Sequence, residues 1–268
     1  MKRRGLPGWA AALLGGVVVI AAWWLLSITV FTPAPGTTFT PVPSPLAVVQ
    51  WLFIDGNILG AWGVFQPTIT EAAIGFLWGN ALALLLASTV LLLPRLEPII
   101  SQVAVVSYCL PVVAVGGIAI VVLGGAKRPG DPSVTAIFLA ALAVFFTTVV
   151  GALLGFKSAD KASLDVVRVF GGSRLTQLRK VRLIAALPAI LNALQIAVPT
   201  ALLGAVLGEY MGATDRSVGI TLIRLQGALD SAGVWSVFLL CAAIALAGYG
   251  VVGLLTRFVT PWIAGRST

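Results

Sequence analysis

Histidine is absent from the sequence, and charged residues make up only 10% of its 268 positions. The first absence removes the commonest general base and the commonest metal ligand, so neither metal-dependent nor histidine-dependent catalysis is expected. The two cysteines, Cys109 and Cys241, lie within apolar runs and are interpreted as small hydrophobic residues. Soluble domains carry roughly 25% charged residues, so an ordinary soluble fold is excluded.

Hydrophobic residues, in contrast, make up 59% of the chain, and the mean hydropathy is +1.05. Their runs are long and lack the period-2 alternation of membrane β-barrels, which predicts an all-α integral membrane protein. Six runs are long enough to cross a hydrocarbon core of about 30 Å. They are Trp9–Val30, Ala72–Leu93, Ile100–Leu123, Val134–Leu154, Ala185–Leu207 and Val234–Leu255.

The basic residues indicate how these spans are oriented. With the N-terminus inside, thirteen of the 17 Lys and Arg residues fall on the cytoplasmic side, seven of them between Lys157 and Arg182. The positive-inside rule therefore predicts that both termini are cytoplasmic. It also explains the formal net charge of +8 without a nucleic-acid partner.

Two segments are expected, residues 1–66 and residues 67–268. The first holds an anchor helix and a proline-rich external connector, in which Ser44 and Pro45 predict the start of a short interfacial helix. The second is a five-helix core with a cytoplasmic loop at residues 157–184. Residues 31–70, 124–133 and 212–233 are expected to be external loops without a separate soluble domain.

The loop after the fourth span has an ordered pattern. Ser163 is expected to cap a short helix, Gly171 and Gly172 to stop it, and Ser173 to cap a second helix. Each helix has an apolar face, which indicates a protein partner. The alternative is a solvated hairpin that only enforces topology, but positive-inside charge explains neither the glycines nor the apolar spacing.

This loop resembles the "EAA" loop of binding-protein-dependent ABC importer permeases. The resemblance rests on Asp165, on Gly171 separated by nine residues from Val181, and on the run Ala185-Ala186-Leu187-Pro188. The six-span layout, the turn at residues 93–100 and the segment at residues 254–262 are most similar to the nitrate, sulfonate and taurine branch. The resemblance covers nearly all of the chain from about Pro67 onward.

The resemblance implies the type I ABC importer permease fold (MetI-like) and a bacterial inner-membrane location. In that family the loop is a coupling helix that sits in a cleft of a cytoplasmic ATPase, which binds ATP and Mg²⁺. Further implied partners are a second permease copy, expected to form a homodimer, an external substrate-binding protein docking near residues 212–233, and membrane lipid. The implied coupling residues are Asp165, Val166, Val167, Phe170, Gly171, Gly172, Ser173, Arg174, Leu187 and Pro188.

The sequence departs from the family pattern in two places. Val166 and Val167 stand where two alanines are usual, and Ile184 stands where the loop has a proline. The exchange of two alanines for Val166 and Val167 enlarges the helix face and suggests a dedicated ATPase with a wider groove.

Glycines and prolines within the spans predict packing and bending. Gly204, Gly208 and Gly212 make a small-residue ridge, either at a dimer or pore seam or inside one subunit. Pro111 and Pro199 each remove a backbone hydrogen bond within a span, which suits a gate but is also tolerated in static bundles.

Two polar residues within the spans are candidates for the pathway. Glu209 is taken as the only acid close to a span core, and its place near the outer end favours contact with headgroups and water. Asn80 either hydrogen-bonds a neighbouring helix or faces the pathway.

The chain lacks the phosphate-loop pattern, so it is not expected to be an enzyme, to bind a cofactor or to hydrolyse ATP itself. We expect a permease subunit that forms the pathway for a small solute, either an anion or a vitamin precursor of the thiamine and riboflavin type. The alternative is a self-contained secondary transporter or channel, which should show more buried ionisable residues and inverted repeats. A membrane scaffold that transports nothing is a third option.

Overall fold

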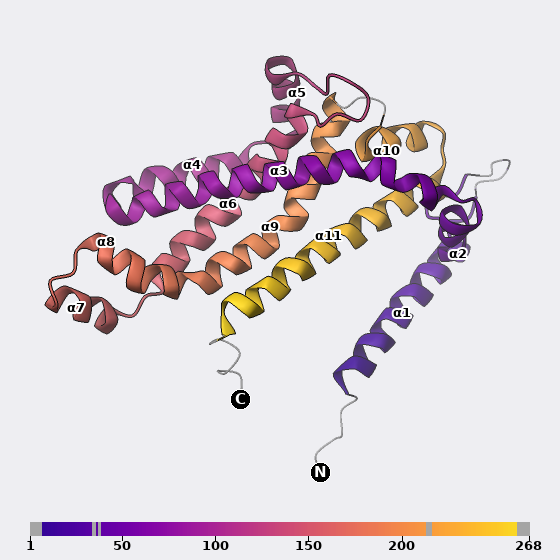
Figure 1. Cartoon of the computed structure of the whole chain (residues 1–268). Coiled ribbons are helices and arrows are strands. Elements are labelled where there is room, and N and C mark those ends of the chain that lie inside the picture. The colour runs from indigo at the N-terminus through magenta and orange to yellow at the C-terminus, as the bar shows by residue number, and fades with distance from the viewer. Residues whose placement is uncertain (1–6, 34–35, 37–38, 213–215, 262–268) are drawn as a thin grey trace, which may run out of the picture. The chain divides into compact units, whose positions relative to one another are not determined.

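The computed structural model describes residues 7–33, 36, 39–212 and 216–261, and every regular element within them is a helix (Figure 1). The helices are α1 (Gly8–Thr29), α2 (Pro45–Val49), α3 (Asn57–Leu92), α4 (Glu97–Cys109), α5 (Val112–Leu123), α6 (Val134–Lys157), α7 (Lys161–Val169), α8 (Arg174–Gln177), α9 (Leu183–Gly212), α10 (Val218–Gly227) and α11 (Ser231–Val259). Single π-helical turns at Gln50–Ile54 and Leu178–Arg182 follow α2 and α8, and a 3₁₀ turn at Pro94–Leu96 precedes α4. The all-α prediction is confirmed.

The chain forms two compact units. Unit 1 comprises residues 1–62 and 221–240, and unit 2 comprises residues 63–220 and 241–268. The functional segmentation at residues 66 and 67 stays a prediction. The basic residues at positions 2–4 and Arg266, on which the orientation partly depends, lie outside the described residues.

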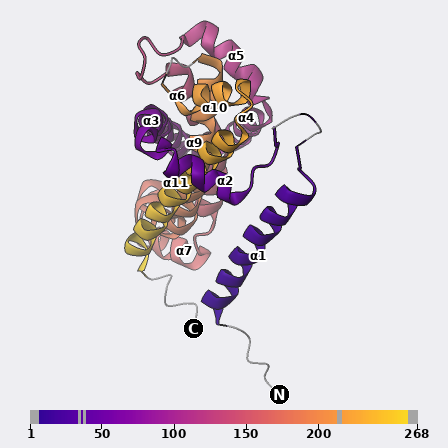
Figure 2. The same cartoon turned by 90° about the vertical axis from the view of Figure 1, so that its right-hand side faces the viewer.

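In unit 1, which contains α1 and α2 (Figure 2), tryptophan side chains join the connector to the helices. The rings of Trp23 on α1 and Trp235 on α11 stack with centroids 5.5 Å apart. Their indole N–H groups donate to the carbonyls of Pro43, at 2.9 Å, and Pro41, at 3.3 Å. Because a buried indole N–H needs an acceptor, these bonds give the extended connector a defined path.

The short helix predicted after the connector is confirmed as α2. The Ser44 hydroxyl accepts a hydrogen bond from the Ala47 N–H at 3.2 Å, and Pro45 occupies the first helical position. At the end of its π turn, the Trp51 indole donates to the Asp230 carboxylate at 2.9 Å. The helix is therefore fixed at both ends within unit 1.

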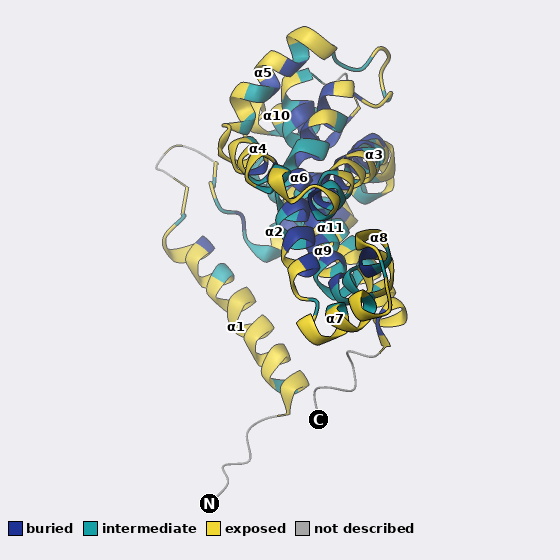
Figure 3. Ribbon diagram, turned by 90° about the vertical axis from the view of Figure 1, so that its left-hand side faces the viewer, coloured by how far each residue is buried: buried dark blue, intermediate teal, exposed yellow. Residues whose placement is uncertain are grey.

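In unit 2, α6 and α9 form the most extensive helix pair, and buried residues concentrate along their contact (Figure 3). Only small residues fit at this interface. A Cβ added at Gly204 would lie 2.7 Å from the Leu139 carbonyl oxygen, which is too close. One added at Gly208 would lie 2.9 Å from the Ala136 nitrogen. Such close backbone approach is how membrane helices gain packing energy without a hydrophobic driving force.

The third predicted span is broken. Residues 94–109 and α5 meet at an angle of 94°, with the break at Leu110 and Pro111 (Figure 1). Pro111 adopts ψ 109° as the residue before α5, so it ends one helix and starts another. Five helical segments have the length and composition of membrane spans, and the bent pair makes a sixth if it is counted as one.

Two predicted loops are partly helical. Residues 57–70 belong to α3, whose first turns were assigned to the external connector, and α10 occupies much of residues 212–233. Both segments contain polar residues that a hydropathy threshold excludes from a span. Backbone hydrogen bonding continues through them nonetheless.

We predict that Gly208→Ala and Gly117→Ala change stability in opposite directions. The methyl group at position 208 would press on the Ala136 backbone, whereas a Cβ at Gly117 of α5 meets nothing within 4 Å. Alanine is the better helix former by about 1 kcal/mol, so Gly117→Ala should raise the thermal midpoint of the purified protein. Overpacking costs about 1–3 kcal/mol, so Gly208→Ala should lower it. Equal shifts for both variants would contradict the α6–α9 contact.

Candidate functional site

The loop between α6 and α9 begins with a capped helix. The Asp160 carboxylate accepts a hydrogen bond from the Ser163 N–H at 3.2 Å, so α7 starts at Lys161. The prediction that Ser163 is the cap was wrong, because Ser163 already lies in the first turn. Both residues are good caps, and Asp160 comes first after α6 ends.

A glycine turn ends α7. Gly171 adopts φ +75°, its N–H donates to the Arg168 carbonyl, and the Gly172 N–H donates to the Val167 carbonyl at 2.8 Å. These two bonds define a Schellman motif, in which the residue with positive φ is usually glycine. The stop predicted at Gly171 and Gly172 is confirmed, and it depends on a backbone conformation that other residues adopt at a cost.

The second helix of the loop is not a separate one. Ser173 caps α8 as predicted, with its hydroxyl accepting from the Thr176 N–H at 3.2 Å. The helix then continues through the π turn into α9, forming one helical segment over Arg174–Gly212. Leu187 and Pro188 therefore lie within α9 and not in the loop. The loop is attached to α9 without a flexible joint.

The tip of α7 presents apolar side chains to its surroundings. Val169 is 83% exposed and Phe170 is 86% exposed, and Val166 is also exposed. Asp165, at the acidic position of the family pattern, forms an ion pair with Arg168 at 3.0 Å. Exposed pairs of this kind contribute little stability, so Asp165 remains available to a partner. The arrangement suits insertion of an apolar tip with a charged flank into a protein groove.

A second polar centre lies at the other end of α6 and α9. Glu71 of α3 is 1% exposed and Glu209 of α9 is fully buried, and the two carboxyl groups are neighbours. Glu71 accepts from the Ser133 N–H at 2.5 Å. Glu209 accepts from the Thr68 hydroxyl at 2.5 Å and the Gly219 N–H at 2.7 Å. The pair joins α3, α9 and the first turns of α6 and α10.

The expectation that Glu209 contacts headgroups and water was wrong, because its side chain is buried against α3 and α10. It is also not the only acid close to a span core. Glu71 was missed because the second span was started at Ala72, one residue too late to include it. A helix running back to Asn57 places Glu71 well inside the structure.

Asn80 and the seam glycines lie in packed contacts, and the two prolines differ in where they stand in their helices. The Asn80 side chain accepts a hydrogen bond from the Thr148 hydroxyl of α6 and donates to the Phe76 carbonyl of its own helix. Pro199 lies within a continuous α9, in contrast to Pro111 at the α4–α5 break. Gly212 faces Ile120 of α5, so the three seam glycines all meet neighbours in the same chain.

We predict that Glu71→Gln preserves or raises stability whereas Glu71→Ala lowers it. The glutamine oxygen can still accept from the Ser133 N–H, and its NH₂ group can donate to Glu209 in place of Glu71 Oε2, which has no partner among the described residues. Alanine leaves the buried Ser133 N–H unpaired, at a cost of about 1–3 kcal/mol. Thermal unfolding of the purified protein measures the difference. Equal losses in both variants would contradict the proposed geometry.

Comparison with known proteins identifies the family of this chain. A family model described as "Binding-protein-dependent transport system inner membrane component" matches residues 79–265. A probable ABC transporter permease protein of Haemophilus influenzae is 30% identical, covering 81% of this chain and 85% of the relative. A putative aliphatic sulfonates transport permease protein, SsuC, of Bacillus subtilis is 28% identical, covering 95% of this chain and 88% of the relative.

The fold also matches a solved structure. One chain of a bacterial ABC transporter involved in the import of the acidic polysaccharide alginate superposes with a TM-score of 0.62 at 16% identity, covering 92% of this chain and 96% of that one. At this identity the match concerns the fold alone. The family match extends over more than half of the sequence, and it includes the whole α7–α8 loop. The chain therefore belongs to the binding-protein-dependent inner-membrane components, the permease subunits that form the translocation pathway of ABC importers.

Proposed function

We propose that the α7–α8 loop is the element through which this permease couples to a cytoplasmic ATPase. The observation that carries the proposal is the exposed pair Val169 and Phe170, held at the tip of α7 by the Gly171 turn. Because α8 continues into α9, a displacement of the tip is transmitted to a helix long enough to span the membrane. ATP and Mg²⁺ bind in the ATPase, which supplies the energy.

The orientation follows from the same assignment. The loop and both termini face the cytoplasm of a bacterial inner membrane, and the Glu71–Glu209 end faces outward. α6 has 24 residues, so at about 1.5 Å per residue the two ends are about 36 Å apart. A substrate-binding protein docks on α10, in which Ile223, Arg224, Gln226 and Gly227 are exposed.

The pathway is enclosed by two copies of the chain. Many large apolar side chains remain exposed, among them Leu77, Trp78 and Leu85 on α3 and Leu246 and Val251 on α11. Lipid covers part of this surface. A twofold partner covers the rest, because a closed symmetric dimer is the commonest assembly and leaves a pathway between identical faces.

The solute is a small organic anion of the aliphatic sulfonate kind. This part of the proposal is supported by the relative SsuC, whose name assigns it to sulfonate transport and which aligns over 95% of this chain. The sequence places no convergent set of Lys or Arg within its apolar runs. Selectivity therefore resides mainly in the binding protein.

We predict that Phe170→Ala weakens co-purification with the ATPase and lowers uptake of a labelled aliphatic sulfonate by the reconstituted complex. Burying a phenylalanine side chain contributes about 1.5–3 kcal/mol, which corresponds to roughly a ten- to hundredfold change in affinity. Leu154→Ala is the matched control, because Leu154 is an exposed apolar residue on α6 that precedes the loop. If both variants retain the ATPase equally, the tip of α7 is not the contact.

We predict that Gly171→Val uncouples ATP hydrolysis from uptake, whereas Gly171→Asn does so much less. No atom lies within 4 Å of a Cβ at position 171, so the strain comes only from φ +75°. A left-handed conformation costs about 1–2 kcal/mol for most residues, but asparagine tolerates it better. The ratio of solute transported to ATP hydrolysed gives the measurement. An unchanged ratio in the valine variant would remove Gly171 from the coupling step.

A further inference from the structure

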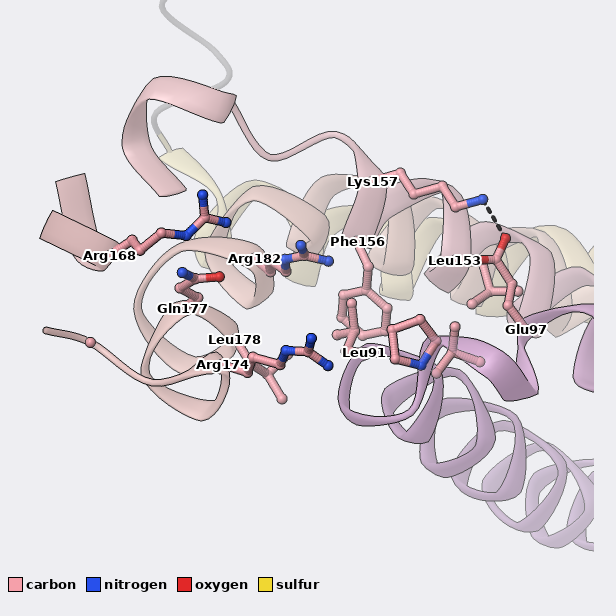
Figure 4. Close-up of a pocket in the computed structure, with 13 residues that line it drawn as sticks. Leu91, Glu97, Leu153, Phe156, Lys157, Arg168, Arg174, Gln177, Leu178 and Arg182 are labelled. Atoms are coloured by element: carbon pink, nitrogen blue, oxygen red, sulfur yellow. Dashed lines mark hydrogen bonds and ion pairs between the residues drawn. The ribbon is translucent and has the colours of Figure 1, made fainter. Parts of the chain in front are cut away.

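A cavity of about 470 Å³ lies beside the α7–α8 loop, at the ends of α3 and α6 (Figure 4). Its apolar wall includes Leu91, Pro94 and Phe156, and Leu178 of the π turn completes that side. Figure 4 shows three arginines around the open space, Arg168 from α7, Arg174 from α8 and Arg182 from the π turn. The cavity is thus apolar on one side and strongly cationic on the other.

The positive charge of this cavity is incompletely compensated. Four basic residues line it, and Glu97 is the only acidic residue that does so. Glu97 is already paired with Lys157, and Arg168 is paired with Asp165 outside the lining. No ion pair involves Arg174 or Arg182 among the described side chains. Guanidinium groups brought together around one space repel each other unless an anion neutralises them.

The shape of the site indicates which anion fits. The planar guanidinium presents paired N–H donors that match phosphate oxygens, and two such groups can bind one phosphate from different sides. A basic pocket between helices at the cytoplasmic surface is the usual place for an anionic lipid headgroup. Here the apolar wall follows the end of a membrane span, where an acyl chain would lie.

We propose that this cavity binds a phosphate group, either the headgroup of an anionic phospholipid or free phosphate, through Arg174 and Arg182. The occupant connects the ends of α3 and α6 with α8 and therefore steadies the coupling loop. The inference rests on the cytoplasmic orientation proposed above. Its test measures binding, so it does not depend on transport.

The experiment compares the assembled transporter carrying Arg174→Gln and Arg182→Gln with one carrying Arg179→Gln and Lys180→Gln. Arg179 and Lys180 are exposed basic residues of the same turn that do not line this cavity, so both double variants lose two positive charges. Each complex is placed in nanodiscs of phosphatidylcholine alone or with one quarter phosphatidylglycerol, and retained lipid is counted by native mass spectrometry. A parallel series in phosphatidylcholine titrates inorganic phosphate and follows the thermal midpoint.

If the site binds a lipid headgroup, the arginine pair variant should lose phosphatidylglycerol affinity by about tenfold or more, since each charged hydrogen bond contributes about 1.5–3 kcal/mol. The control variant should match the parent. If the site binds free phosphate, only the phosphate-dependent rise of the thermal midpoint should disappear. Lysine at both positions should restore part of the binding, which separates loss of charge from misfolding.

Two results would overturn the proposal. If the two double variants retain the same amount of lipid and show the same phosphate-dependent rise of the thermal midpoint, the cavity has no preference for phosphate. If the Arg174→Gln and Arg182→Gln variant no longer co-purifies with the ATPase while lipid retention and the phosphate effect are unchanged, the cavity binds an acidic side chain of the ATPase instead. Neither result would contradict the α7 tip as the coupling contact, because Val169 and Phe170 do not line this cavity.

Discussion

Close backbone contact between α6 and α9 is the constraint on which the rest of unit 2 depends. In lipid, apolar side chains gain little from leaving the solvent, so two helices stay together only if they approach closely enough for dense packing. Gly204 and Gly208 permit that approach to Leu139 and Ala136. At the other end of the pair, Gly155 lies against Ala186 in the same manner. The pair therefore behaves as one rigid element along its length.

The α6–α9 pair holds a polar centre at each of its two ends. The Glu71–Glu209 pair connects the start of α6 to the end of α9, and the α7–α8 loop connects the end of α6 to the start of α9. In the proposed coupling, a displacement of the loop tip acts on the whole α6–α9 pair and not on one turn of helix.

Local patterns predicted local structure well, and long-range contacts less well. The caps at Ser44 and Ser173 and the glycine stop at Gly171 follow from residue types within a few positions, so sequence was enough. Glu71 could not be recognised as buried, because hydropathy places a span boundary beside a charged residue whether or not that residue has a partner. Its hydrogen-bond donor, Ser133, and its buried neighbour, Glu209, lie 62 and 138 positions away.

The two valines that depart from the family pattern, Val166 and Val167, differ in exposure and in what they contact. The side chain of Val167 lies against Gly172, and its carbonyl accepts the Gly172 N–H, so Val167 packs on the turn that ends α7. Val166 is exposed beside the α7 tip. Val166 therefore adds more to the exposed surface of the α7 tip than the partly buried Val167 does. In the proposed contact with an ATPase, extra room is therefore needed mainly for the side chain of Val166.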